Sequence, residues 1–149
     1  MEGKGRITGH TGLLALIGSP VGHSGSPAMY NYSFEKLGLD YAYVAFDIKV
    51  EEVKAALDAM RLFHMRGCNV TMPCKTEAAK YMDELSPAAR IIGAVNTIVN
   101  EDGKLIGHMT DGEGFVGNLR DHGIEIKGKK ITVAGGGGAA TAIQGQCAL

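Results

Sequence analysis

Short apolar runs alternate with amphipathic segments along residues 1–110 of the chain. The run at 13–18 ends at Gly-Ser-Pro and is apolar enough for a strand buried on both faces, as in parallel sheets. The whole pattern predicts strands at residues 13–18, 41–48, 67–71 and 94–99. The segments between them predict helices at 27–37, 50–62 and 75–85, with another short helix from Ser86.

The pattern also predicts which residues begin the helix at 27–37 and which residues of the helices at 27–37 and 50–62 face the core. Pro27 suits the first position of its helix, with Ser26 as the N-cap. We expect the buried face of that helix to carry Met29, Tyr32 and Leu37. The inner face of the next helix is expected to carry Val53, Ala56, Leu57 and Met60.

A hairpin and a helix follow the strand at 94–99. Residues 100–103 (NEDG) predict a turn, after which 104–108 return antiparallel. The helix at 111–121 is expected to end with Gly123 in the left-handed conformation.

The last segment begins a second unit. It predicts a strand at 130–134, a glycine loop at 135–138 and the start of a helix. The fold class is therefore α/β. A mostly parallel βαβ domain spans 1–110, and 111–149 form the first strand, loop and helix of a truncated Rossmann-like dinucleotide-binding domain.

Composition and charge narrow the class of protein. With 45% hydrophobic and 21% charged residues, the chain is not disordered, and 15 Lys+Arg against 16 Asp+Glu argue against nucleic-acid binding. No apolar run reaches the roughly 18 residues of a membrane helix, and the polar, Gly-rich N-terminus is not a secretory signal. The odd number of cysteines, 3, argues against a disulfide framework. We expect a cytoplasmic protein with no nucleic-acid or membrane partner.

The glycine loop is a candidate phosphate site. Gly135, Gly137 and Ala140 fit the pattern G-x-G-x-x-G/A between a predicted strand and a helix. Glycines let the main chain approach a pyrophosphate, whose charge meets free N–H groups at the helix N-terminus. The alternative is a tight turn without a ligand. A Walker loop is excluded because no Gly-Lys-Ser/Thr follows.

Two further segments carry polar side chains at predicted strand ends. Ser24 and Ser26 flank a glycine after the first strand and suit a polyol or carboxylate, although Ser26 could simply cap the helix. Asn69 and Thr71 leave the same face of the third strand. Lys75 lies at a helix start, where a cation opposes the macrodipole, so its position suits acid–base work better than stability. The alternative is a solvated surface lysine.

Asn96 and Asp111 are two further candidate site residues, and the Cys and His residues are candidate metal ligands. Asn96 is an uncharged polar residue in an apolar strand, so it needs hydrogen-bond partners if it is buried. Asp111 is either a functional carboxylate or the N-cap of its helix. The spacing of Cys and His residues does not predict a metal site.

Taken in order, these motifs resemble the shikimate dehydrogenase family. The resemblance runs from residue 13 to the last residue and rests on five motifs: Ser24-x-Ser26-Pro27, NVTMPCK (69–75), GAVNT (93–97), TDG (110–112) and GGGGAATA (135–142). It implies a two-domain α/β enzyme that reversibly reduces 3-dehydroshikimate to shikimate with NADP(H), or NAD, in aromatic amino-acid biosynthesis. Quinate is a further candidate substrate.

The resemblance also implies roles for individual residues. Lys75 and Asp111 would form the catalytic pair. The substrate would be held by Ser24, Ser26, Asn69, Thr71 and Asn96. The cofactor phosphates would face Gly135, Gly137, Gly138 and Ala139.

Some features depart from the family pattern. Tyr30-Asn31 stands where many relatives have His-Asn, and Met109 stands where Asn is frequent, which removes a polar group near Asp111. Family members are roughly twice as long, so this chain alone is expected to bind substrate without measurable turnover. The alternatives are a non-catalytic substrate-binding module and a nucleotide-binding protein of another kind. An exposed sheet edge would favour self-association, for example as a homodimer.

Overall fold

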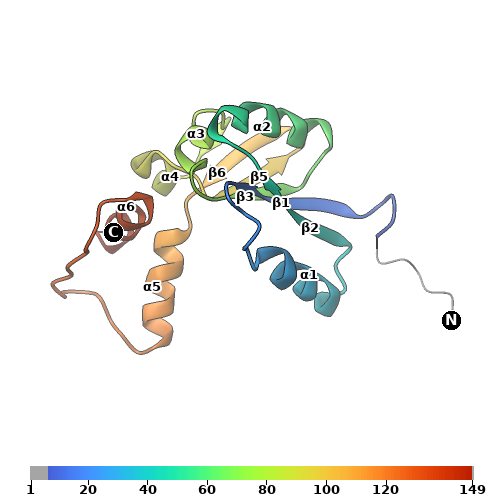
Figure 1. Cartoon of the computed structure of the whole chain (residues 1–149). Coiled ribbons are helices and arrows are strands. Elements are labelled where there is room, and N and C mark those ends of the chain that lie inside the picture. Colours follow the sequence, from blue (N-terminus) through green and yellow to red (C-terminus); the bar gives the residue numbers. More distant parts are fainter. Residues whose placement is uncertain (1–6, 149) are drawn as a thin grey trace.

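The computed structural model describes residues 7–148, which form a six-stranded mixed sheet with helices on both faces (Figure 1). The strands are β1 (Gly12–Gly18), β2 (Tyr41–Asp47), β3 (Gly67–Val70), β4 (Glu84–Leu85), β5 (Thr97–Glu101) and β6 (Lys104–His108). The α-helices are α1 (Ser26–Leu37), α2 (Val53–Leu62), α3 (Lys75–Ala79), α4 (Pro87–Ile92), α5 (Asp111–Asp121) and α6 (Gly138–Cys147), and the 3-10 helix η1 (Val50–Glu52) precedes α2. None of the helices in residues 7–148 is long and apolar enough to cross a membrane.

The sheet order is β2-β1-β3-β5-β6-β4. The β1–β2, β1–β3 and β4–β6 pairs are parallel, whereas β3–β5 and β5–β6 are antiparallel. The predicted α/β fold and the antiparallel return of β6 are therefore confirmed. The β5–β6 turn has positive φ at both central residues, Asp102 (51°) and Gly103 (94°), which is the backbone that a two-residue hairpin requires.

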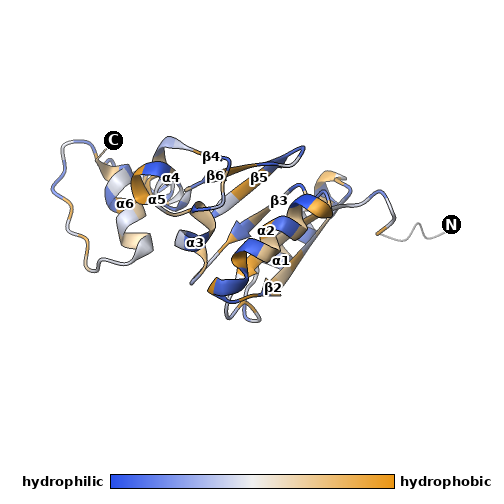
Figure 2. Cartoon of the chain, turned by 90° about the horizontal axis from the view of Figure 1, so that it is seen from above, coloured by the Kyte–Doolittle hydropathy of each residue, from blue (hydrophilic) through white to orange (hydrophobic). Residues whose placement is uncertain are grey.

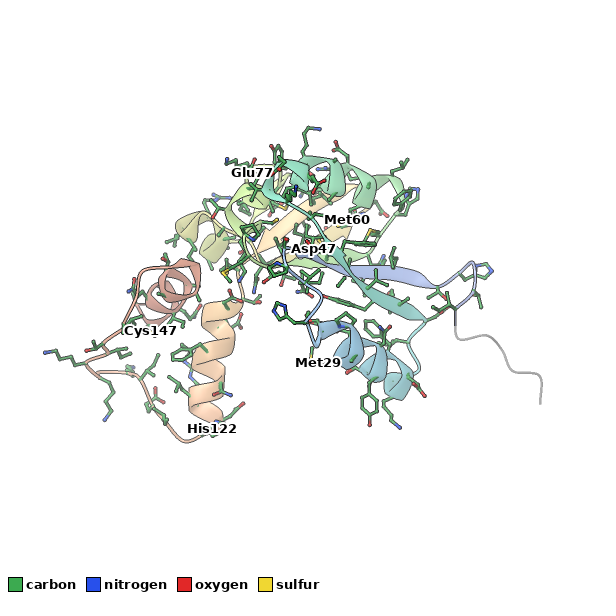
Figure 3. The ribbon with its side chains drawn as sticks, in the orientation of Figure 1. Met29, Asp47, Met60, Glu77, His122 and Cys147 are labelled. Carbon is green, nitrogen blue, oxygen red and sulfur yellow. The ribbon has the colours of Figure 1, made fainter. Side chains whose placement is uncertain are left out.

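Two apolar clusters hold the helices against the sheet. On one face, α2 buries Val53, Leu57 and Met60 as predicted, and Figure 3 shows Met60 between α2 and the strands. On the other face, α1 packs over β1 and β2, where Phe34 joins Leu16 and Tyr43 in a second cluster. The sheet thus has a helix layer on each side (Figure 1).

The predicted inner face of α1 is wrong. Met29, Tyr32 and Leu37 are exposed, and Figure 3 shows Met29 near the N-terminal end of α1. The face that meets the sheet instead carries Phe34 and Tyr30, because aromatic rings at this spacing reach the β2 tyrosines.

Two predicted segment boundaries are also wrong. The helix expected at 75–85 ends at Ala79, because Glu84–Leu85 pair with β6 and the Asp83 carboxylate accepts the Leu105 N–H at 2.7 Å. The strand expected at 94–99 begins only at Thr97, so Asn96 lies in the bend before it.

The strand predicted at 130–134 is not formed. A strand needs a neighbour to receive its main-chain hydrogen bonds, and no strand within residues 7–148 pairs with this segment. The helix after it, α6, nevertheless packs against α5 and α4. In Figure 2 these three helices group at the end of the molecule away from the N-terminus. Gly123, with φ of 74°, follows the end of α5 as predicted.

Close packing of α5 on α6 predicts a strict requirement for glycine at position 112. A Cβ there would overlap the main-chain oxygen of Ala142, and it would lie 2.7 Å from the Gln146 Cβ. We expect Gly112→Ala to lower the free energy of unfolding by about 1–3 kcal/mol. Gly114→Ala is the matched control, since its Cβ meets open space and alanine favours the helix by about 0.5–1 kcal/mol. Urea unfolding of both variants measures this, and equal stability of the two would contradict the packing argument.

Candidate functional site

The candidate site begins where the parallel strands β1 and β3 end. The Thr71 N–H donates to the Ile17 carbonyl at 2.9 Å, and the Ser19 N–H donates to the Met72 carbonyl at 3.0 Å. The loop after β1, which carries Ser24 and Ser26, is therefore bonded to the loop after β3, which carries Thr71. Ligands of open α/β sheets bind at this kind of edge.

Ser24 and Ser26 are half-buried in the loop and at the start of α1. Ser26 is not the N-cap, because α1 begins at Ser26 itself and Gly25 occupies the cap position. The Ser24 Oγ accepts the Ser26 N–H at 3.2 Å. This bond uses a lone pair of the Ser24 hydroxyl and leaves its hydrogen available for an anionic ligand.

Lys75 and Asp111 form an ion pair, with 2.6 Å between the Lys75 Nζ and the Asp111 Oδ2. Their side chains are 22% and 29% exposed, so the pair is only partly screened by water. Each is the first residue of its helix, α3 or α5. An ammonium there is opposed by the macrodipole, so the Asp111 carboxylate is what makes the position of Lys75 favourable.

Asn96 holds the Asp111 carboxylate from the other side. Its Nδ2 donates to the Asp111 Oδ1 at 2.5 Å and to the Thr110 Oγ1 at 3.0 Å, while its Oδ1 accepts the Thr110 N–H at 3.0 Å. Both Asp111 oxygens are therefore engaged. Asp111 does not cap α5, since Thr110 occupies the N-cap position without a side-chain cap bond.

Asn69 is linked to this cluster through the bend at Asn96. Its Nδ2 donates to the Thr97 Oγ1 at 3.2 Å and to the Asn96 carbonyl at 3.4 Å, and its Oδ1 accepts the Tyr43 hydroxyl at 2.8 Å. Tyr43, Thr97 and Thr110 were not predicted as site residues. Thr97 and Thr110 lie within the GAVNT and TDG motifs, which could have pointed to them, whereas the contact of Tyr43 depends on strand order and has no local motif.

The glycine loop is a separate feature. Residues 135–139 are exposed, and no hydrogen bond or ion pair within residues 7–148 joins them to Lys75 or Asp111. Gly135 has φ of 120°, which side chains rarely adopt, and a Cβ at any of the four glycines would meet open space. The N-terminus of α6 has neither a side-chain cap nor an acidic residue in its first turn. Its N–H groups therefore suit an anion.

Three other residues near the site are packing residues. Met109 is buried in the larger core cluster, so its side chain is not presented beside Asp111. Cys74, next to Lys75, is buried with its thiol 3.6 Å from the Ile48 carbonyl, and burial raises its pKa. Burial also raises the pKa of Cys68 to about 12, and the raised pKa of each thiol disfavours its thiolate form. No group of three or more potential metal ligands exists in the described part of the chain.

The mixed α/β sheet thus carries a lysine–carboxylate pair at its strand ends, and a glycine-rich helix start follows later in the chain. The family model for the shikimate dehydrogenase substrate binding domain matches residues 16–98. This match covers more than half of the chain, which therefore belongs to the shikimate dehydrogenase family.

Known relatives agree with this assignment. A shikimate dehydrogenase (NADP(+)) of Listeria monocytogenes is 55% identical over 144 residues, which are 97% of this chain and 50% of the relative. A crystal structure of shikimate 5-dehydrogenase from the same species, in complex with shikimate and NAD, superposes with a TM-score of 0.90 at 55% identity and covers 93% of this chain and 48% of that one. The 5-ketofructose reductase of a Gluconobacter species reaches a TM-score of 0.89 at 32% identity over 95% of this chain and 50% of that one. The chain thus spans about half the length of the relatives it matches.

The partly buried Lys75–Asp111 pair should couple more strongly than an exposed pair. In a double-mutant cycle of Lys75→Met and Asp111→Asn, we expect a coupling free energy of about 1 kcal/mol. The matched control is Lys54→Met with Asp58→Asn, a pair at 2.7 Å whose side chains are 63% and 55% exposed. Its coupling should be about 0.3 kcal/mol. Denaturant unfolding at low and high salt measures both. Equal couplings would contradict the strengthening expected from partial burial, and zero coupling between Lys75 and Asp111 would show that they are not paired in solution.

Proposed function

We propose that this chain is the substrate-binding part of a shikimate dehydrogenase that interconverts 3-dehydroshikimate and shikimate with NADP(H). The observation that carries the proposal is the Lys75–Asp111–Asn96 cluster at the strand ends of a chain that belongs to this family. In this proposal residues 1–110 bind the substrate, and 111–149 begin the cofactor-binding part.

The polar groups at the strand ends match the chemistry of this substrate. Hydroxyls donate to carboxylates, so Ser24, Ser26 and Thr71 are suited to the carboxylate of the acid. Asn69 and Asn96 are suited to the ring hydroxyls. The bond from Asn96 to the exposed Thr110 hydroxyl is the one that a ring hydroxyl can replace at least cost.

Lys75 and Asp111 are suited to the proton transfer. Reduction of the ketone places negative charge on its oxygen, and the Lys75 ammonium can donate a proton to that oxygen. Asp111 keeps the ammonium in place, and Asn96 keeps the Asp111 carboxylate oriented. In the reverse direction, neutral Lys75 accepts the proton of the substrate hydroxyl.

The residues at the start of α6 fit a dinucleotide. An exposed loop of four glycines, followed by uncapped N–H groups, would hold the phosphates through Gly135, Gly137, Gly138 and Ala139. The cofactor, when bound, supplies the hydride. The Listeria monocytogenes relative is a shikimate dehydrogenase (NADP(+)), and the crystal structure from the same species contains NAD, so NADP is proposed first and NAD second.

Ligand binding tests the substrate assignment directly. Shikimate should raise the melting temperature of the chain in a saturable manner, since a ligand at 100 times its Kd stabilises by about 2.7 kcal/mol. The same measurement with quinate tests whether this related acid also binds. 5-Ketofructose tests a keto-sugar substrate, which the Gluconobacter relative makes a second candidate. A shift with 5-ketofructose or with a nucleotide alone, and none with shikimate, would refute the proposed substrate.

A pair of threonine variants locates the binding. Thr71→Val removes a hydroxyl at the strand end with little change in shape, and we expect shikimate affinity to fall about 10- to 100-fold. Thr76→Val, at an exposed position of α3, is the control and should bind as the unchanged chain does. Equal affinities of the two variants would place the ligand elsewhere.

The proton-transfer role of Lys75 is tested by turnover. In an enzyme that joins these residues to a complete cofactor domain, Lys75→Ala should lower kcat by about 10²–10⁴-fold with a smaller effect on KM. Lys54→Ala, an exposed lysine on α2, is the control. Oxidation of NADPH by 3-dehydroshikimate measures both variants. A kcat retained within a few-fold in Lys75→Ala would remove Lys75 from the reaction, and binding without turnover in the unchanged enzyme would favour a non-catalytic module.

A further inference from the structure

Tyr43 is an aromatic residue of an edge strand that is held at three points. Asn31 of α1 accepts the Tyr43 N–H at 3.0 Å and donates to the Tyr43 carbonyl at 2.7 Å. The ring stacks on Tyr30, with 4.5 Å between centroids and 17° between planes. The side chain is buried in the cluster with Leu16. Neither the main chain nor the ring of Tyr43 is therefore free to reorient.

The hydroxyl of Tyr43 reaches across β1 to Asn69. Tyr43 pairs with Leu14 and Asn69 pairs with Leu16, so both point to the α1 face of the sheet from opposite sides of β1. Burial raises the pKa of Tyr43 well above its usual value, which keeps the hydroxyl protonated and able to donate. It donates to the Asn69 Oδ1 at 2.8 Å.

The partners of Asn69 decide which way its amide faces. The Asn96 carbonyl can only accept, so the Asn69 Nδ2 must point toward it and the Oδ1 toward Tyr43. Both amide hydrogens are then used, by Asn96 and Thr97. Only one lone pair of the Oδ1 is left for another group.

We propose that Tyr43, stacked on Tyr30, is a positioning residue that fixes the Asn69 amide, so that Asn69 meets a substrate hydroxyl as an acceptor only. The substrate part of this inference rests on the proposed function. Asn69 is in turn bonded to the main chain of Asn96, and the Asn96 side chain is bonded to Asp111, so the orientation of Asn69 is coupled to that of Asp111.

The test compares Tyr43→Phe with Tyr30→Phe. Tyr43→Phe keeps the stacked ring and removes the bond to Asn69, whereas Tyr30→Phe keeps both the ring and that bond. We expect Tyr43→Phe to weaken shikimate binding about 5–10-fold in calorimetry and Tyr30→Phe to change it less than twofold. Tyr43→Phe should have no further effect in the Asn69→Ala background, because its action passes through Asn69. Additive losses in this cycle, or equal effects of the two tyrosine variants, would overturn the proposal.

A second measurement needs no ligand. The side-chain NH2 signals of Asn69, assigned by their loss in Asn69→Ala, should shift and exchange faster with solvent in Tyr43→Phe but not in Tyr30→Phe. Thr97→Val, which removes a partner of the amide without touching the aromatic stack, should have a similar effect and serves if Tyr43→Phe does not fold. Unchanged signals in these variants would refute the proposal that Tyr43 fixes the Asn69 amide. If the chain without substitutions binds no shikimate, the proposed function is refuted. The NH2 signals would still show whether Tyr43 fixes the Asn69 amide.

Discussion

The Lys75 ammonium at the first turn of α3 is the constraint on which the site depends. A cation there is opposed by the helix macrodipole and is partly removed from water, so it requires a carboxylate within ion-pair distance. Asp111 supplies it from the start of α5, more than thirty residues later in the chain. The bend at Asn96 and the approach of α5 to the sheet are both needed to bring the two charges together. The same features bring the polar side chains of β3 and of the β5 bend to one sheet edge.

Most of the fold could be predicted because local pattern and burial agree. The apolar run of β1, the Asp102-Gly103 turn and the inner face of α2 each depend on residues close in sequence. The errors arise where a long-range partner decides. The 75–85 segment is divided because β4 pairs with β6. The inner face of α1 is the one that carries its aromatic residues, because these rings stack against β2. The 130–134 segment has strand composition but no neighbour within residues 7–148.

The candidate site was predictable in its residue types but not in its connections. Side chains at strand ends and helix starts can be recognised from turn residues nearby, and Ser24, Thr71 and Lys75 are of this kind. The partners of those side chains depend on the order of the strands in the sheet and on the path of the main chain through the bend at Asn96. Tyr43 illustrates this, since its sequence position marks only an aromatic residue of a strand, whereas its role depends on lying one strand away from β3. Polar networks of this kind span elements and leave no local signature.

The three residues Thr110, Asp111 and Gly112 connect the sheet to the helices α5 and α6. Thr110 and Asp111 are bonded to Asn96, and Asp111 is also paired with Lys75 on the sheet side. Gly112 lets the main chain of α6 lie directly against α5. α6 begins at the glycine loop and packs against α5, so the contact between these two helices, with Gly112 at their close approach, relates the loop to the Lys75–Asp111 pair. In the proposed function, a hydride donor and a proton donor must act on the same carbonyl group, and this packing of α6 on α5 is a direct way to keep their sites in register.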